Sequence, residues 1–221
     1  MSDILASGVT SADLSIDRLF AGPASDIRAE HIILLSGQNL TRGTLLGKIS
    51  TAGVSETHAG NTGNGVFTPD ASTPVLAGAK PGVYTVRLIT AAANGGVFRV
   101  EDPDGFVLGD VAVGATFADD IKFVIAAGST DFVVGDTFLV TVAAGSGKYV
   151  KSLAAASDGS QVPDAILVHD TDASGGDKET VAYKGGWFNE SRVTYGAGHT
   201  ADSVREGLRV KGINLIKVLS A

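Results

Sequence analysis

Residues 83–89 read Val83-Tyr84-Thr85-Val86-Arg87-Leu88-Ile89, a stretch in which apolar and polar side chains alternate. A period of two places Tyr84, Val86 and Leu88 on one face of a β-strand. The turn sequence Asn94-Gly95-Gly96 and a second short apolar run follow, a pattern that is typical of a hairpin. This stretch therefore predicts an antiparallel β-hairpin with one buried face.

Further short strands are expected along the same segment, after a Pro-Asp-Gly turn at residues 103–105. They are predicted at residues 106–113, 121–126, 131–134 and 137–142. The segment has no sustained apolar period of 3.6 residues, which an amphipathic helix would need. Several short strands at this spacing indicate an antiparallel β-sandwich.

The segment that carries these strands differs from its flanks in charge. Residues 61–145 hold nine acidic and four basic residues, whereas residues 146–221 hold nine of each. Glycine-rich turns at residues 60–65 and 143–147 mark both borders. Insertions are tolerated where the chain ends of the host lie close together at the surface. We therefore expect residues 61–145 to be a domain inserted into a host domain made from residues 29–60 and 146–221.

The flanks predict a second β-rich unit with one helix. Strands are expected at residues 30–35, 40–49, 148–151, 165–169, 180–183 and 213–219. The helix should begin after Thr200 or Ser203, because Ser203-x-x-Glu206 fits a capping box and Gly212 suits a helix end. Residues 1–28 are small and polar with scattered apolar side chains, so we expect an arm that cannot form a core of its own.

Composition excludes several classes of protein. The 221 residues include no cysteine, so the chain can form no disulfide, thiolate metal site or cysteine nucleophile. A net charge of −7 argues against a nucleic-acid partner, whose binding favours a basic surface. Charged residues interrupt every stretch before the ~18 apolar residues that a membrane helix needs. No basic start or apolar run marks a secretory signal, which indicates synthesis in a reducing cytoplasm.

No motif predicts catalysis. Residues 43–48 and 145–148 contain glycine and lysine but lack the spacing of a phosphate-binding loop. Residues 170–177 begin like a calcium loop, yet Val181 stands where a bidentate glutamate is needed, so weak calcium binding and a solvated acidic turn remain alternatives. The four histidines lack metal-ligand spacing, and there is no Gly-x-Ser-x-Gly elbow. We therefore predict no enzyme activity, no catalytic residue, no cofactor and no metal.

The aromatic pair Trp187-Phe188 is the remaining candidate site. It lies in the sequence Lys184-Gly185-Gly186-Trp187-Phe188-Asn189 and contains the only tryptophan of the chain. Buried aromatic packing or a subunit interface formed by Trp187 and Phe188 is expected here, rather than stacking on a ligand.

Three stretches of the flanks follow a common family pattern. Residues 35–49 contain Arg-Gly-Thr-Leu-Leu-Gly-Lys-Ile after an apolar strand, and residues 156–167 contain Asp-Gly-Ser-Gln followed by Ala-Ile-Leu. Residues 185–190 read Gly-Gly-Trp-Phe-Asn-Glu. In this order they are similar to "rGtvLGki", "DGSq…GIL" and "rGeFNe" of the head decoration proteins of tailed bacteriophages of the lambda type. Ala165 replaces the glycine of "GIL", and residues 61–145 interrupt the pattern.

The resemblance implies a mainly β protein: a β-clip or β-tulip-like host domain with one or two short helices, interrupted here by the sandwich. It also implies a homotrimer on the outer surface of the virion, where it binds the major capsid protein and cements the expanded shell against the pressure of packaged DNA. The capsid-binding arm would use Ile4, Leu5, Val9, Leu14, Ile16, Leu19 and Phe20. The alternative function is a carbohydrate- or cell-adhesion module, in which the inserted sandwich binds host-surface or environmental glycans.

Overall fold

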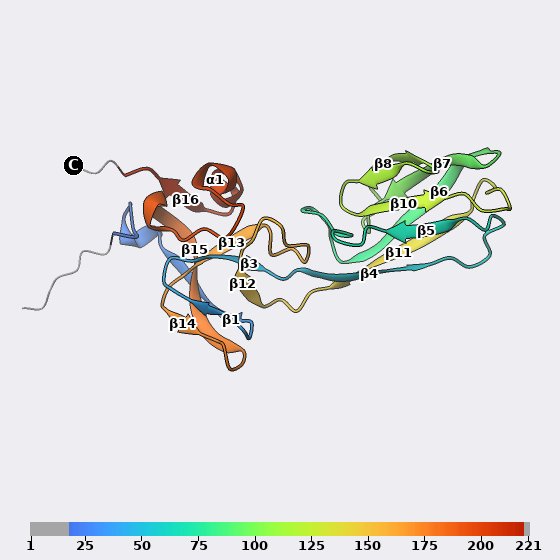
Figure 1. Cartoon of the computed structure of the whole chain (residues 1–221). Coiled ribbons are helices and arrows are strands. Elements are labelled where there is room, and N and C mark those ends of the chain that lie inside the picture. The colour runs from blue at the N-terminus through green and yellow to red at the C-terminus, as the bar shows by residue number, and fades with distance from the viewer. Residues whose placement is uncertain (1–17, 219–221) are drawn as a thin grey trace, which may run out of the picture.

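The computed structural model describes residues 18–218 and consists mainly of β-strands, which confirms the predicted fold class. Figure 1 shows two β-rich regions joined by the extended strands β4 and β11. We call residues 51–144 the inserted region and the described residues on either side of it the host region. None of the described helices is long and apolar enough to cross a membrane.

Six strands of the host region form one sheet in the order β1-β12-β3-β13-β15-β16, and an additional β1–β15 pairing closes part of it into a barrel-like shape. Their bounds are Arg28–Leu34 (β1), Leu45–Lys48 (β3), Tyr149–Lys151 (β12), Pro163–Leu167 (β13), Lys178–Asn189 (β15) and Ile213–Ile216 (β16). A separate small sheet pairs Asn39–Leu40 (β2) with Thr171–Asp172 (β14), and two 3-10 turns occupy Ala24–Asp26 (η1) and Glu190–Arg192 (η2).

The helix α1 spans Ala201–Val210, close to the predicted position. Its capping box pairs Thr200 with Ser203: the Ser203 N–H donates to Thr200 Oγ1 at 3.2 Å, and the Thr200 N–H donates to Ser203 Oγ at 2.9 Å. The predicted box between Ser203 and Glu206 is therefore wrong, because the helix begins one residue after Thr200. Val204 and Leu208 are buried against the host sheet.

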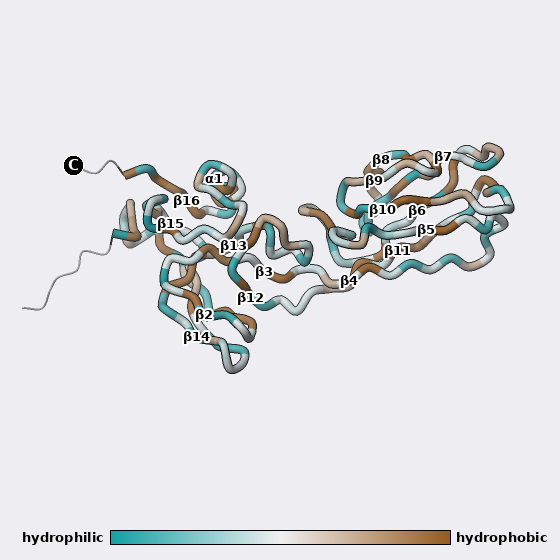
Figure 2. The backbone as a smooth tube through the Cα atoms, viewed as in Figure 1, coloured by the Kyte–Doolittle hydropathy of each residue, from teal (hydrophilic) through white to brown (hydrophobic). Residues whose placement is uncertain are grey.

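The inserted region contains two sheets that enclose one hydrophobic core. The larger has the order β4-β11-β6-β7-β8 and the smaller the order β5-β10-β9. Their bounds are Thr51–Thr57 (β4), Thr137–Ala144 (β11), Gly82–Ala92 (β6), Gly95–Glu101 (β7), Val107–Ala112 (β8), Val66–Pro69 (β5), Lys122–Ala126 (β10) and Thr116–Ala118 (β9). Tyr84, Val86 and Leu88 are all fully buried, as their alternation predicts. In Figure 2 apolar segments follow these strands.

The strand predicted at residues 131–134 is absent from this part of the structure, which forms a turn instead. The buried Asp136 carboxylate accepts hydrogen bonds from the backbone N–H groups of Thr62, Gly63 and Val133 at 2.9–3.1 Å. Burial opposes the charge of Asp136, but these three bonds outweigh it and hold its pKa below the usual range. Because the carboxylate accepts three backbone hydrogen bonds, it holds this segment in a turn, and residues 131–134 do not pair with a neighbouring strand.

The two regions are connected by a continuous two-stranded ribbon. The host strands β3 and β12 pair from Lys48 with Tyr149, and the strands β4 and β11 continue the pairing from Thr51 with Ala144. Between them the Ile49 N–H donates to Lys148 O at 2.9 Å and the Gly147 N–H donates to Ile49 O at 2.9 Å. Residues 51–57, which the sequence assigns to the host domain, thus pair within the sheet of the inserted region.

Candidate functional site

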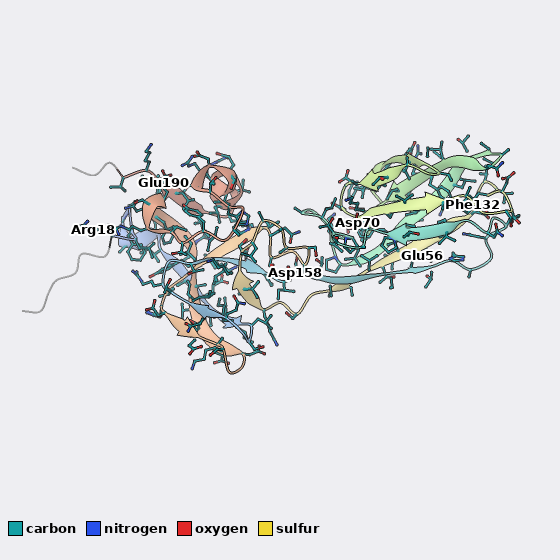
Figure 3. All side chains as sticks on the ribbon, in the orientation of Figure 1. Arg18, Glu56, Asp70, Phe132, Asp158 and Glu190 are labelled. Carbon is teal, nitrogen blue, oxygen red and sulfur yellow. The ribbon has the colours of Figure 1, made fainter. Side chains whose placement is uncertain are left out.

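The first described residue and the inserted region lie at opposite ends of the described structure. Arg18, the first described residue, is at the end of the host region that faces away from the inserted region, and the chain leaves its last described strand at the same end (Figures 1 and 3). Phe132 lies near the opposite extremity (Figure 3). An arm that precedes Arg18 therefore starts at the far end from the inserted region.

The root of the arm is built into the host region. The Asn189 N–H donates to Leu19 O at 2.8 Å and the Ala21 N–H donates to Trp187 O at 2.9 Å, so residues 19–21 run along the edge of β15. Leu19 is only 5% exposed and belongs to the same hydrophobic cluster as Phe188. The Leu19 side chain is therefore part of the host core, and a contact of this residue with the capsid stays a prediction.

Phe20 is also part of this anchor. Its ring centroid lies 5.3 Å from that of Tyr183 and 5.7 Å from that of Phe188, and the Arg42 guanidinium lies 5.5 Å from the Phe20 ring. Such aromatic and cation–π contacts hold Phe20 against the barrel. The other predicted arm residues lie outside the described residues: Ile4, Leu5, Val9, Leu14 and Ile16.

Trp187 and Phe188 point to opposite faces of β15, as neighbours on a strand do. Phe188 is fully buried in the core of the host region, so its side chain has no surface with which to contact a second subunit. Trp187 is 38% exposed, packs on Gly22, and donates from Nε1 to Asp26 Oδ2 at 3.0 Å. A subunit contact through Trp187 remains a prediction, whereas Phe188 serves the core.

The segments 43–48 and 156–167 pack closely against each other, and each has a glycine close to this contact. A side chain at Gly47 would place its Cβ 1.9 Å from the backbone oxygen of Ser160. Gly159 has a φ of +89°, and a Cβ there would lie 1.9 Å from Ser50 Oγ. Close packing of these two segments therefore requires glycine at positions 47 and 159.

A half-buried charged cluster was not evident from the sequence. The Tyr149 hydroxyl donates to Asp164 Oδ2 at 2.8 Å, Lys184 Nζ donates to the Tyr149 hydroxyl at 2.6 Å, and Lys184 forms an ion pair with Asp164. Lys211 Nζ lies 3.2 Å from Asp164 Oδ1. Burial opposes both charges, but the hydrogen bonds within the cluster lower the pKa of Asp164 and raise that of Lys184.

Replacement of Asp164 tests what this cluster contributes to stability. D164N removes the counter-charge of a Lys184 side chain that is 17% exposed, and we expect the free energy of unfolding to fall by about 2 kcal/mol, between the values for exposed and for fully buried pairs. Chemical denaturation at neutral pH measures the change. D110N, which breaks the well-exposed pair with Arg99, is the control and should cost much less.

The difference in unfolding free energy between the natural protein and D164N should also depend on pH. The pKa of Asp164 is lower in the folded state than the ~3.9 of an unfolded aspartate, so its stabilisation is complete above that pH and is lost as the pH falls through the folded value. The difference in unfolding free energy between the natural protein and D164N should therefore shrink below about pH 4. A difference that stays constant down to pH 2 would contradict this assignment.

The structure also places Ser152 beside His199, a pair that lies 47 positions apart in the sequence. The Ser152 Oγ to His199 Nε2 distance is 3.1 Å, within the range of an activated nucleophile. Ser152 is fully buried, however, and its hydroxyl also lies 2.7 Å from Ser160 O. Burial also lowers the pKa of His199. The pair links two segments of the host region, with the serine hydroxyl buried and the histidine half-buried.

The carboxylates of the acidic turn at residues 170–177 are occupied by the protein's own donors. Asp170 accepts the Arg42 N–H at 2.6 Å, and Asp172 accepts the Ser174 N–H at 2.9 Å. Asp177 accepts the Ser36 N–H at 3.0 Å and pairs with Lys148 at 2.5 Å. No group of three or more metal-ligating side chains forms among the described residues.

Most phenylalanines of the inserted region fill its core. Phe138 is fully buried, and its ring centroid lies 5.6–5.9 Å from those of Phe67, Phe98 and Phe132. Phe106 differs, since it is 69% exposed in the turn before β8. Aromatic residues of this region therefore serve mainly its own stability.

The chain was compared with solved structures, with curated proteins and with protein families. Two crystal structures of FlgL from Xanthomonas campestris, in space groups H3 and C2, are 20% identical with a TM-score of 0.31 over 48% and 45% of this chain, and the chain spans about a third of their length (33% and 31%). Curated proteins gave no match. A family described as "Bacteriophage lambda head decoration protein D" matches residues 13–210. The chain therefore belongs to the bacteriophage lambda head decoration protein D family.

Proposed function

We propose that this protein binds the outer surface of the phage head as a homotrimer, contacts the major capsid protein, and cements the expanded shell against internal DNA pressure. The observation that carries the proposal is the family match over residues 13–210. Cementing requires no catalytic group: it requires a stable β core, an attachment segment and a symmetry that suits the capsid lattice. The protein would be synthesised in the host cytoplasm and then assemble on the shell.

The positions of the chain ends support an orientation on the capsid. The root of the arm at Leu19 and Phe20 lies at the end opposite the inserted region (Figure 1). In our proposal this end faces the shell, and residues 1–17 contact the major capsid protein by adding an extended strand with alternating apolar side chains. Three arms on one trimer would raise the overall affinity by about 10²–10⁴ over one arm, because the second and third contacts become intramolecular.

We also propose that the host and inserted regions are separate domains. The core of the inserted region contains residues from Phe67 to Val142 and shares no member with the two host clusters. The division follows the strand pairing, so the inserted domain comprises residues 51–144 rather than 61–145. With the arm on the shell, the inserted domain projects outward from the capsid.

Electron microscopy of expanded capsids mixed with the purified protein tests the proposal. We expect new density at the threefold and quasi-threefold positions, with three outward projections at each, and greater resistance of the coated capsids to chelation or heating. Light scattering of the free protein should give three times the chain mass of 22.4 kDa. A monomer at high concentration that leaves the capsids uncoated would refute the proposal.

A further inference from the structure

The wall of the host barrel contains an open seam between β1 and β12. The two strands meet only at Leu34 and Tyr149, where the Leu35 N–H donates to Tyr149 O at 2.9 Å. From Arg28 to Ile33, β1 has one partner strand in the described structure, β15. A cavity of about 400 Å³ lies along the seam, lined by β1, the Lys48 side chain and residues 146–149.

Apart from its contact with β12 at Leu34 and Tyr149, the open side of β1 presents backbone groups that pair with no described strand. In an antiparallel pair, the N–H and C=O groups of alternate residues point away from the partner strand. The Leu35 N–H points to β12, so Ala29, His31 and Ile33 share that direction. All three are exposed, with Ile33 at 43%. An edge of this kind is a template for pairing with another chain.

The strand β16 provides a second open edge at the other end of the same sheet. Among the described strands β16 pairs with β15 alone, in parallel. It carries the half-buried Asn214 and Ile216, and Val218 just beyond it is 48% exposed. Neither β1 nor β16 contains proline, which natural proteins often place on edges that must stay unpaired.

The two edges have complementary side chains. Beside β1 the carboxylates of Glu30 and Glu179 form no ion pair within the described residues. Lys48 and Lys148 line the same seam, and Lys148 is paired with Asp177. The segment around β16, residues 211–218, contains no acidic residue; its Lys217 is exposed, whereas Lys211 is paired with Asp164. Exposed apolar side chains also match, since Ile33 lies on one edge and Ile216 and Val218 lie at the other.

We infer that the subunits of the trimer are joined edge to edge, with β1 of one copy pairing with β16 of the next. The inference rests on the proposed trimer, because a closed ring of three requires two different surfaces on each subunit. A contact of β1 with another β1 would be twofold and could not close a ring of three. The paired edges extend the host sheet from subunit to subunit and cover the seam.

The absence of cysteine from the chain allows a direct test by disulfide cross-linking. The double variants H31C/N214C and H31C/I216C place one thiol on each edge, in two registers, and are oxidised as free protein and on coated capsids. A disulfide forms only when the two Cα atoms lie about 4.4–6.8 Å apart. We expect at least one double variant to give a covalent trimer on a non-reducing gel, whereas each single variant stays monomeric.

The control H31C/V210C places the second thiol on α1, where Val210 is 79% exposed but outside the edge, and should give no trimer. A short bismaleimide reagent, applied to the same variants, tolerates small errors of register. Trimers in sedimentation with no specific cross-link in either double variant would overturn the edge pairing and leave the proposed function intact. Monomers in sedimentation, with uncoated capsids, would instead refute the proposed function.

Discussion

Deletion of residues 2–17 should abolish the coating of expanded capsids and leave the protein folded. The deletion ends before Leu19 and Phe20, which pack in the core of the host region, so the melting temperature should change by less than about 2 °C. Cosedimentation with capsids and calorimetry measure the two effects. We expect loss of binding by at least 10²-fold, because three linked contacts disappear together.

Two comparison variants sharpen this result. Deletion of residues 2–20 also removes the buried Leu19 side chain, and a large cavity in a core typically costs about 2–5 kcal/mol, so this variant should melt at a clearly lower temperature. The second variant keeps the length of the arm but replaces its apolar side chains by serine, at Ile4, Leu5, Val9, Leu14 and Ile16. If the 2–17 deletion still coats capsids, the host region itself makes the attachment and the arm assignment fails.

The substitution F138A should destabilise the inserted region and leave the stability of the host region unchanged. Phe138 is fully buried and contacts the rings of Phe67, Phe98 and Phe132, so truncation to alanine should cost about 3–5 kcal/mol. Calorimetry should then show one transition shifted by ten degrees or more and a second transition unchanged, since a domain of this size shifts by roughly 4–8 °C per kcal/mol.

Leu139 is the matched control for this experiment, because it neighbours Phe138 on β11 but is 43% exposed. L139A should leave both transitions close to those of the natural protein. Capsid coating by F138A at a temperature between the two transitions gives an independent measure, since the proposed attachment arm is anchored in the host region. A single transition that shifts as a whole in F138A would show that the two regions unfold as one unit, contrary to the proposed division.

Local patterns in the sequence predicted the inserted region better than the host region. The alternation around Tyr84, Val86 and Leu88 specified a buried face, and all three side chains are fully buried. A period of two is sufficient there because neighbouring strands of β6–β8 are connected by short turns. The turn at Asp136 was missed because its backbone partners at Thr62 and Gly63 lie more than 70 positions away.

The host region depends on contacts that no local pattern reveals. The strand β1 pairs with β15 about 150 positions later, and residues 19–21 join the same edge of β15. This pairing explains why Leu19 is buried in the host core and why Phe20 packs against it. The charged cluster of Asp164, Lys184 and Tyr149 forms in the same way, from three strands that are separated in the sequence.

Family membership assigns the protein to the phage head and to an association with the capsid. Two glycines of the family pattern have a physical explanation within this chain. Gly47 in β3 and Gly159 in the turn before β13 allow these two segments to pack closely, because a Cβ at either position would overlap a neighbouring oxygen.

The ribbon that joins β3 and β12 to β4 and β11 has a practical consequence for engineering. Thr51 and Ala144 are direct partners across an antiparallel ladder, so the two ends of any replacement need to lie only about 4.5–5.5 Å apart. Such spacing is common where a hairpin or a whole domain begins and ends at adjacent strands. The junction is therefore a grafting position for a foreign antigen or enzyme in place of residues 51–144, and in the proposed orientation such a graft would be displayed on the outside of the capsid.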